Sequence, residues 1–238
     1  MKKNAAEDYS TLYSPEEDFD VVYTRFTAKR ICKAIKPGQQ VLEMGSATSH
    51  MTEFLVKAGA KVDCVERWER YIKIAKKKKL PGVNFYQSDM EDFEAEKKYD
   101  HIIFTNVIHE LYEREAVLKK ASKWLKKSGK IHITMPNPES IHRKAALYAG
   151  MIDSLADLGP RGEKYHAVKL LYNDEVVKLV QKATGLKCTK RDGVLLKPLP
   201  NDSMQKLAPK VLEAFDKLAS EFIENSGMSY FVFSKRTK

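Results

Sequence analysis

The segment 41–55 constrains the fold of this chain more than any other part of the sequence. A short apolar run containing Glu43 leads into the small residues Gly45, Ser46 and Ala47, and an amphipathic stretch follows. This order predicts a strand, a loop and a helix. Because glycine has no Cβ and the next two side chains are short, the loop backbone can approach a small ligand closely.

A second acidic residue lies at the spacing typical of a nucleoside-binding fold. Glu66 ends the apolar run 62–65, 21 residues after Gly45. In Rossmann-like folds an acid at this distance from the loop accepts hydrogen bonds from the two ribose hydroxyls. The loop and the acid together predict a nucleoside cofactor.

The missing glycines indicate which kind of nucleoside cofactor this is. A dinucleotide fold needs the pattern G-x-G-x-x-G, and here its second and third glycine positions are Ala47 and His50. Glu43 would also repel a pyrophosphate, whereas it suits a cofactor that carries an ammonium group. A nicotinamide-dependent oxidoreductase is therefore disfavoured.

Four elements in this order resemble the class I S-adenosylmethionine-dependent methyltransferases. Glu43-Met44-Gly45 is similar to their E-x-G loop, Glu66 to their ribose acid, and Asp89-Met90 to the pair that holds and covers the adenine. Segment 99–106 resembles their fourth strand. The alternative is an ordinary α/β core with acidic residues at strand ends by chance. The resemblance implies S-adenosylmethionine as cofactor, with these candidate binding residues: Tyr23, Arg25, Glu43, Gly45, Ser46, Ala47, Glu66, Arg67, Asp89, Met90 and Asn106.

Two further stretches resemble bacterial methyltransferases that act on small molecules or sugars. Segment 106–111 is similar to their N-V-L-E-H-V, with the Glu and His exchanged in order, and segment 135–143 is similar to V-P-N-x-x-S-L-H-R. Ser49 stands where the family usually has glycine. The resemblance also implies that the last strand inserts antiparallel between strands five and six.

Apolar runs alternate with helical patterns along most of the chain. This predicts an α/β fold: a Rossmann-like, seven-stranded, mostly parallel sheet with helices on both faces and an insertion or lid after strand five. We expect strands at 41–44, 61–65, 83–86, 100–105, 130–134, 187–194 and 229–234, and helices at 20–36, 49–58, 67–78, 113–127, 173–184 and 203–224.

We expect one domain over 1–238. Residues 1–36 form an N-terminal helical lid in this interpretation, with Tyr13 able to fold back over the cofactor. Residues 136–172, rich in proline and glycine around a short helix at 145–152, form an insertion on the substrate side.

Composition favours an ordinary cytoplasmic enzyme. At 238 residues and 43% hydrophobic, the chain can bury one substantial core, and no apolar stretch reaches the length of a membrane span. The three cysteines stand apart without metal-ligand spacing, and we expect no metal. The net charge of +10 lies largely in lysine pairs on exposed helix faces, so nucleic-acid binding is not favoured, and a small anionic substrate is compatible with it. The oligomeric state stays open.

Methyl transfer to a hydroxyl needs a general base, whereas neutral amines need little activation. The candidate bases are His109, His142 and His166, because each follows a strand or lies in the insertion; His101 and His132 lie inside strands and are expected to pack there. Candidate substrate-binding residues are Arg143, Arg161, Lys164 and Tyr172. The sequence favours O-methylation of a small phosphorylated or sugar-linked metabolite, with N-methylation of a small amine, RNA methylation and a non-catalytic cofactor-binding module as alternatives.

Overall fold

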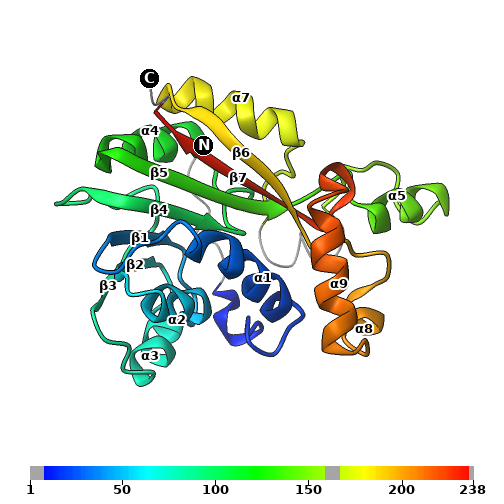
Figure 1. Ribbon diagram of the computed structural model, residues 1–238, viewed down its shortest axis with the longest axis horizontal. Helices are drawn as coiled ribbons and strands as arrows, with labels where there is room; N and C mark the ends of the chain where they lie inside the picture. The colour runs from blue at the N-terminus through cyan, green and yellow to red at the C-terminus, as the bar shows by residue number, and fades with distance from the viewer. Residues whose placement is uncertain (1–7, 159–166, 236–238) are drawn as a thin grey trace.

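The computed structural model describes residues 8–158 and 167–235, which build one seven-stranded sheet in the order β3-β2-β1-β4-β5-β7-β6 (Figure 1). β7 runs antiparallel to both of its neighbours, and the other neighbouring strands are parallel. The strands are β1 (Gln40–Met44), β2 (Lys61–Glu66), β3 (Val83–Gln87), β4 (Tyr99–Thr105), β5 (Leu125–Pro136), β6 (Lys187–Val194) and β7 (Met228–Ser234).

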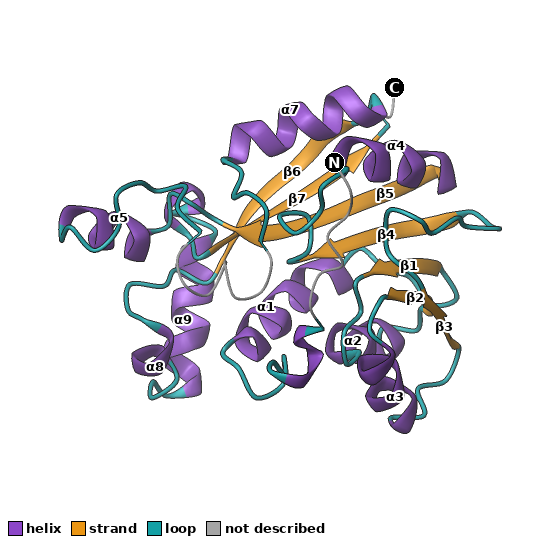
Figure 2. Cartoon of the chain, turned by 180° about the vertical axis from the view of Figure 1, so that it is seen from behind, coloured by secondary structure: helices purple, strands orange, loops and turns teal. Residues whose placement is uncertain are grey.

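Helices cover both faces of this sheet. Figure 2 shows α4 (Arg114–Trp124) and α7 (Asn173–Thr184) on one face, and α1 (Asp20–Cys32), α2 (His50–Lys57) and α3 (Glu69–Lys77) on the other. α5 (Ile141–Tyr148) projects away from the sheet beside α8 (Asn201–Met204) and α9 (Pro209–Ala219). Two short 3₁₀ helices complete the described elements: η1 (Tyr9–Thr11) and η2 (Ile223–Asn225).

Alternate residues of the central strands supply two separate cores. Leu42 and Met44 of β1 face the core beneath α4 and α7, whereas Val41 of the same strand faces the core beneath α1 and α2. All three side chains are fully buried. A parallel sheet covered on both faces has no solvent side, which is why its strands read as continuous apolar runs.

The predicted seven-stranded, mostly parallel sheet with helices on both faces is confirmed, and so is the antiparallel insertion of the last strand. The long helix expected at 203–224 is wrong: α8 ends at Met204, and α9 begins at Pro209. Proline lacks the N–H that a helix interior needs but is tolerated in the first turn, so Pro209 begins a new helix. The first helix also ends at Cys32, four residues before the predicted end at Lys36.

None of the helices that the structure describes is both long and apolar enough to cross a bilayer.

Candidate active site

The loop after β1 has a left-handed backbone at every second residue. Gly45, Ala47 and Ser49 have φ values of 79°, 42° and 67°. A Cβ on Gly45 would lie 2.7 Å from Cγ1 of Val107, so only glycine leaves the loop in this position. Ala47 and Ser49 adopt a conformation that disfavours residues with a Cβ by about 1–2 kcal/mol.

This backbone strain can be tested by substitution. We expect Ala47→Gly and Ser49→Gly each to raise the free energy of unfolding by roughly 0.5–1 kcal/mol, because relief of strain outweighs the entropy that glycine adds to the unfolded chain. Urea denaturation followed by circular dichroism measures the change. Ala58→Gly is the control, since Ala58 has φ −78° at the end of α2 and gains nothing from glycine. Unfolding free energies at or below that of the parent would contradict the strain.

Glu43 lies at the end of β1 and is almost fully buried. Its Oε2 accepts hydrogen bonds from Oγ1 of Thr52 at 2.7 Å and from Sγ of Cys64 at 3.9 Å. Burial raises the pKa of Glu43 to about 8. A cation bound beside Glu43 would favour the ionised form of this carboxyl and would then pair with it. The sequence predicts an ammonium group of the cofactor in this place.

Glu66 is the last residue of β2 and holds the loop after β1 in place. Its Oε2 accepts a hydrogen bond from the backbone N–H of Ala47 at 2.8 Å, and its Oε1 accepts one from Trp68 at 2.9 Å. Burial raises the pKa of Glu66. Each carboxylate oxygen has a further lone pair, so both can still accept a hydroxyl.

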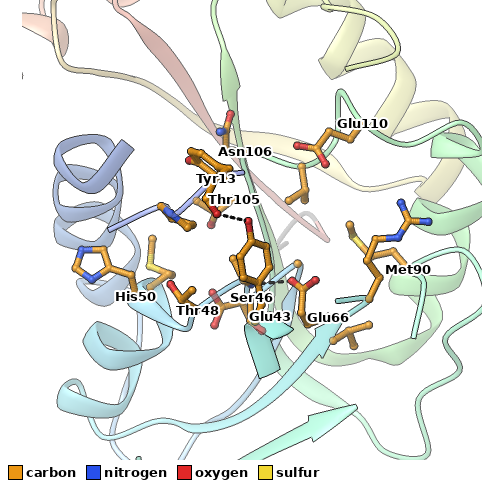
Figure 3. Close-up of a pocket in the computed structure, with 18 of the residues that line it drawn as sticks. Tyr13, Glu43, Ser46, Thr48, His50, Glu66, Met90, Thr105, Asn106 and Glu110 are labelled. Carbon is orange, nitrogen blue, oxygen red and sulfur yellow. Dashed lines mark hydrogen bonds between the residues drawn. The ribbon is translucent and has the colours of Figure 1, made fainter. Parts of the chain in front are cut away.

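A cavity of about 370 Å³ lies at the carboxyl ends of β1, β2 and β4, with the sequence-predicted Glu43, Gly45, Ser46, Ala47, Glu66, Arg67, Asp89, Met90 and Asn106 in its lining. Figure 3 shows Glu43, Ser46, Glu66, Met90 and Asn106 of this lining, which come from separate parts of the chain and surround one space. Nε of Arg67 pairs with Oδ1 of Asp89 at 2.6 Å, which ties β2 to the segment after β3.

The N-terminal segment covers this cavity. Tyr9 and Tyr13 both line it, and the hydroxyl of Tyr71 donates a hydrogen bond to the backbone oxygen of Tyr13 at 2.7 Å. The ring of Tyr9 packs edge-on against Trp68 at 5.8 Å between centroids. Tyr13 thus lines the same cavity as the loop after β1.

The polar groups of the cavity lining suit a bound nucleoside. Oγ1 of Thr105 and Oδ1 of Asn106 are buried in the cavity wall and have no hydrogen-bond partner among the described residues. Buried polar atoms of this kind are costly unless a ligand or water satisfies them. Together with the glycine turn and the two carboxyls, they suit a nucleoside that carries an amino-acid group.

A second cavity of about 240 Å³ adjoins the first. Both cavities are lined by Tyr9, Tyr13, Asp20, Asn106 and Glu110, so these residues form their common boundary. The rest of the second lining comes from α1, the turn after β4, the end of β5, α5 and the segment after it, the segment before α7, α8, and the residues after β6 and around the start of β7. Ligands of open α/β sheets bind at this edge.

His109 and His142 both line the second cavity, and Nδ1 of each is buried without a hydrogen-bond partner in the described part of the chain. Burial, with the nearby charge of Arg114, lowers the pKa of His109 to about 4. Burial, with Lys197 and Arg143, lowers the pKa of His142 to about 3. Both imidazoles are therefore neutral at pH 7 and can accept hydrogen bonds.

Two cations line the same cavity. Nε of Arg143 donates to the backbone oxygen of Leu155 at 3.0 Å, and its Nη2 donates to that of Asp157 at 2.5 Å, so Arg143 also holds the segment after α5 in place. Lys197, just beyond β6, is only 7% exposed. Two cationic side chains in one lining are compatible with an anionic ligand.

Other predicted residues lie elsewhere. Tyr23 lines the second cavity rather than the first, and Tyr172 precedes α7 outside both linings. Arg25 also lies outside both linings, with its guanidinium 4.7 Å from the Phe26 ring. Arg161, Lys164 and His166 lie outside the described residues. His101 and His132 form a buried hydrogen-bond chain to the hydroxyl of Tyr230, with distances of 2.9 and 2.8 Å.

The sequence analysis missed Tyr9, Asp20, Glu110 and Lys197 as site residues. Lys197 gave a usable signal, because it is a single charge inside the apolar run 193–199 at the end of a strand. Glu110 lies in the segment that resembles N-V-L-E-H-V, but of the Glu and the His in that segment only His109 was predicted as a site residue. The other two carry no local pattern.

The sequence of residues 35–185, more than half of the chain, matches the family described as "Methyltransferase domain". An uncharacterized methyltransferase of Anoxybacillus flavithermus is 29% identical over 167 residues, which are 66% of this chain and 77% of that protein.

Solved structures share the fold. A putative methyltransferase of Haloferax volcanii, in complex with the Trm112 methyltransferase activator, has a TM-score of 0.66 and is 13% identical in sequence. The match covers 97% of this chain and 98% of the Haloferax volcanii chain. A SAM-dependent methyltransferase of Archaeoglobus fulgidus has a TM-score of 0.64 at 17% identity, with coverage of 96% and 100%. The chain belongs to the methyltransferase-domain family.

Proposed function

We propose that this S-adenosylmethionine-dependent methyltransferase methylates a small anionic metabolite on oxygen, with a phosphorylated or sugar-linked acceptor of the kind found in surface-polysaccharide pathways. The observation that carries the proposal is the second cavity, which adjoins the cofactor cavity and has both the buried Lys197 and Arg143 in its lining. A volume of about 240 Å³ suits a metabolite. An extended nucleic-acid strand needs an open groove instead.

When bound, S-adenosylmethionine supplies an electrophilic methyl group on a sulfonium. The residues of the chain have to place the acceptor in line with that group and to exclude water, and positioning of this kind accounts for much of the rate in such displacements. In this proposal Lys197 binds the anionic group of the acceptor, and the neutral imidazoles of His109 and His142 accept hydrogen bonds from its hydroxyls. Tyr9 and Tyr13 close the site.

N-methylation of a small amine is a second candidate. The carboxyls of Asp20 and Glu110 line the same cavity and would attract an ammonium group. The two candidates differ in the charge of the acceptor, so an acceptor screen separates them.

We propose the cytoplasm as the compartment and expect no metal in the reaction. Cys32, Cys64 and Cys188 are free thiols, in keeping with a reducing environment. One group of possible metal ligands occurs in the described residues, Glu16, His50 and Glu53 within 4.8 Å of one another. Nζ of Lys78 pairs with both of these carboxylates, which supports a structural role for the group.

The screen uses labelled S-adenosylmethionine in the presence of a chelator. Its acceptor sets are sugar phosphates and nucleotide sugars, small primary and secondary amines, and transfer RNA. We expect label only in the first set. Label in amines alone would favour the second candidate, and label in RNA alone would refute a small acceptor.

Lys197→Met tests where the acceptor binds. We expect the acceptor KM to rise about 10–100-fold, since a charge-assisted hydrogen bond contributes about 1.5–3 kcal/mol, with little change in cofactor affinity. Steady-state kinetics with the acceptor from the screen measures the effect. Lys190→Met is the control, because Lys190 is a half-exposed residue of β6, the strand that precedes Lys197, and pairs with Asp192. An unchanged KM would place the acceptor elsewhere.

A further inference from the structure

The boundary between the two cavities contains two carboxyl groups, those of Asp20 and Glu110. Asp20 begins α1 and accepts a hydrogen bond from the hydroxyl of Tyr13. Glu110 lies in the turn between β4 and α4, and Figure 3 shows its carboxylate directed into the cofactor cavity. A group that passes from the cofactor to an acceptor in the second cavity has to cross this boundary.

The turn that carries Glu110 is held from several sides. The backbone N–H of Glu110 donates to Val107 at 3.0 Å. The guanidinium of Arg114 donates from Nε to the backbone oxygen of Ile108 at 2.9 Å and from Nη2 to that of His109 at 3.1 Å. The backbone N–H of Val168 also donates to His109 at 2.9 Å. Because its backbone is fixed in this way, the carboxyl of Glu110 is preorganised at the boundary.

Tyr9 orients this carboxyl. Its hydroxyl donates a hydrogen bond to Oε2 of Glu110 at 3.2 Å, across 101 residues of sequence. A carboxylate has two lone pairs on each oxygen, so this bond leaves acceptor capacity for a substrate proton. Tyr9 lines both cavities as well, which places the pair at the point where cofactor and acceptor would meet.

The charged and titratable groups that act on Glu110 come from several elements. Burial raises its pKa to about 8, and the carboxylates of Glu66 in β2 and Asp20 in α1 act in the same direction. The hydrogen bond from Tyr9 of η1 and the charge of Arg67 act in the opposite direction. A base works best when its pKa lies near the working pH, so Glu110 is better matched to neutral conditions than His109 or His142.

We propose that Glu110 is the catalytic carboxylate that accepts the acceptor's proton at the boundary of the two cavities, and that Tyr9 positions it. This inference rests on the proposed function in one respect, the location of the acceptor in the second cavity. The acceptor's lone pair forms the bond to the methyl carbon, and the electron pair of the carbon–sulfur bond stays on sulfur. The proton of the acceptor passes to the Glu110 carboxylate, which later releases it to solvent.

A binding experiment tests the position of Glu110 without any acceptor. S-adenosylmethionine and S-adenosylhomocysteine share all charged groups except the sulfonium, so the difference between them isolates the groups that face the transferred methyl. Calorimetry at pH 7 in buffers of different ionisation enthalpy gives the number of protons released. We expect S-adenosylmethionine to release close to one proton more than S-adenosylhomocysteine, because its charge ionises Glu110.

Glu110→Gln should abolish this difference and lower the preference for S-adenosylmethionine about tenfold, whereas Glu113→Gln should retain both. Glu113 is the matched control, an exposed carboxyl in the same segment that lines neither cavity. An unchanged difference in the Glu110 variant would overturn the proposal. If neither ligand binds the parent protein, the assignment of the cofactor fails instead.

Turnover tests the catalytic step. With the acceptor identified in the screen, Glu110→Gln should lower kcat about 10²–10⁴-fold at unchanged cofactor affinity, and Glu110→Asp should recover part of that loss. An unchanged kcat would remove Glu110 from proton transfer. A screen in which only RNA accepts the methyl group refutes the small acceptor but leaves the result of the binding experiment intact.

Discussion

Replacing Glu66 with alanine is expected to weaken S-adenosylmethionine binding about 100-fold or more. We expect the carboxylate to offer both oxygens to the ribose hydroxyls, and a hydrogen bond to a charged group contributes about 1.5–3 kcal/mol. The same carboxylate holds the backbone N–H groups of Ala47 and Trp68 at 2.8 and 2.9 Å. The variant therefore loses the cofactor contacts and also releases the loop that places Gly45.

Isothermal calorimetry with S-adenosylhomocysteine measures this effect directly. Glu69→Ala is the matched control, because Glu69 lies three residues further along the chain, is 61% exposed and pairs with Lys73. We expect its affinity to stay within a factor of two of the parent, in keeping with the small contribution of exposed ion pairs. Unchanged affinity in the Glu66 variant would remove that residue from the cofactor site.

Replacing Arg30 with methionine is expected to lower the free energy of unfolding by about 3–5 kcal/mol. Nη1 of Arg30 reaches both carboxylate oxygens of Asp216, at 2.8 and 3.0 Å, and Nε lies 3.4 Å from Asp192. All three side chains are close to fully buried. Methionine fills similar space but leaves the buried carboxylate of Asp216 without its cation and leaves Asp192 with only the half-exposed Lys190. An unpaired buried charge is costly.

Lys29 provides the matched control for Arg30. It is the preceding residue of α1 and pairs with Glu213 of α9 at 3.5 Å, with both side chains about half exposed. We expect Lys29→Met to cost less than about 1 kcal/mol. Urea denaturation at fixed pH without cofactor gives both values. If Arg30→Met cost no more than Lys29→Met, the buried network would not stabilise the packing of α1 against α9 and β6.

Most of the strands could be predicted because they are short and apolar and are bounded by turn residues. The expected strand 61–65 differs from β2 only by Glu66, and the expected 187–194 coincides with β6. The break in the helix expected at 203–224 could not be predicted from the apolar spacing of that segment. That spacing continues across the break at residues 205–208, and only the effect of Pro209 on the backbone separates the two helices.

The candidate site also contains residues that the sequence could predict and residues that it could not. Glu43, Gly45 and Glu66 stand at fixed distances within two consecutive strand–loop units, so a local pattern suffices to predict that they face one ligand. Tyr9 and Glu110 are 101 residues apart, and Arg30 and Asp216 are 186 apart. No local pattern relates the members of such pairs.

The sequence by itself determined the order of the strands, the glycine loop after β1 and the positions of Glu43 and Glu66, because these depend on backbone freedom and on periodicities of a few residues. Only the tertiary structure decided that the segment carrying Tyr9 closes over the loop, and that Glu110 and Lys197 border the second cavity. These positions depend on how the sheet twists and how the helices pack on it. Contacts of that kind join residues from distant elements, so they become visible only once the chain is folded.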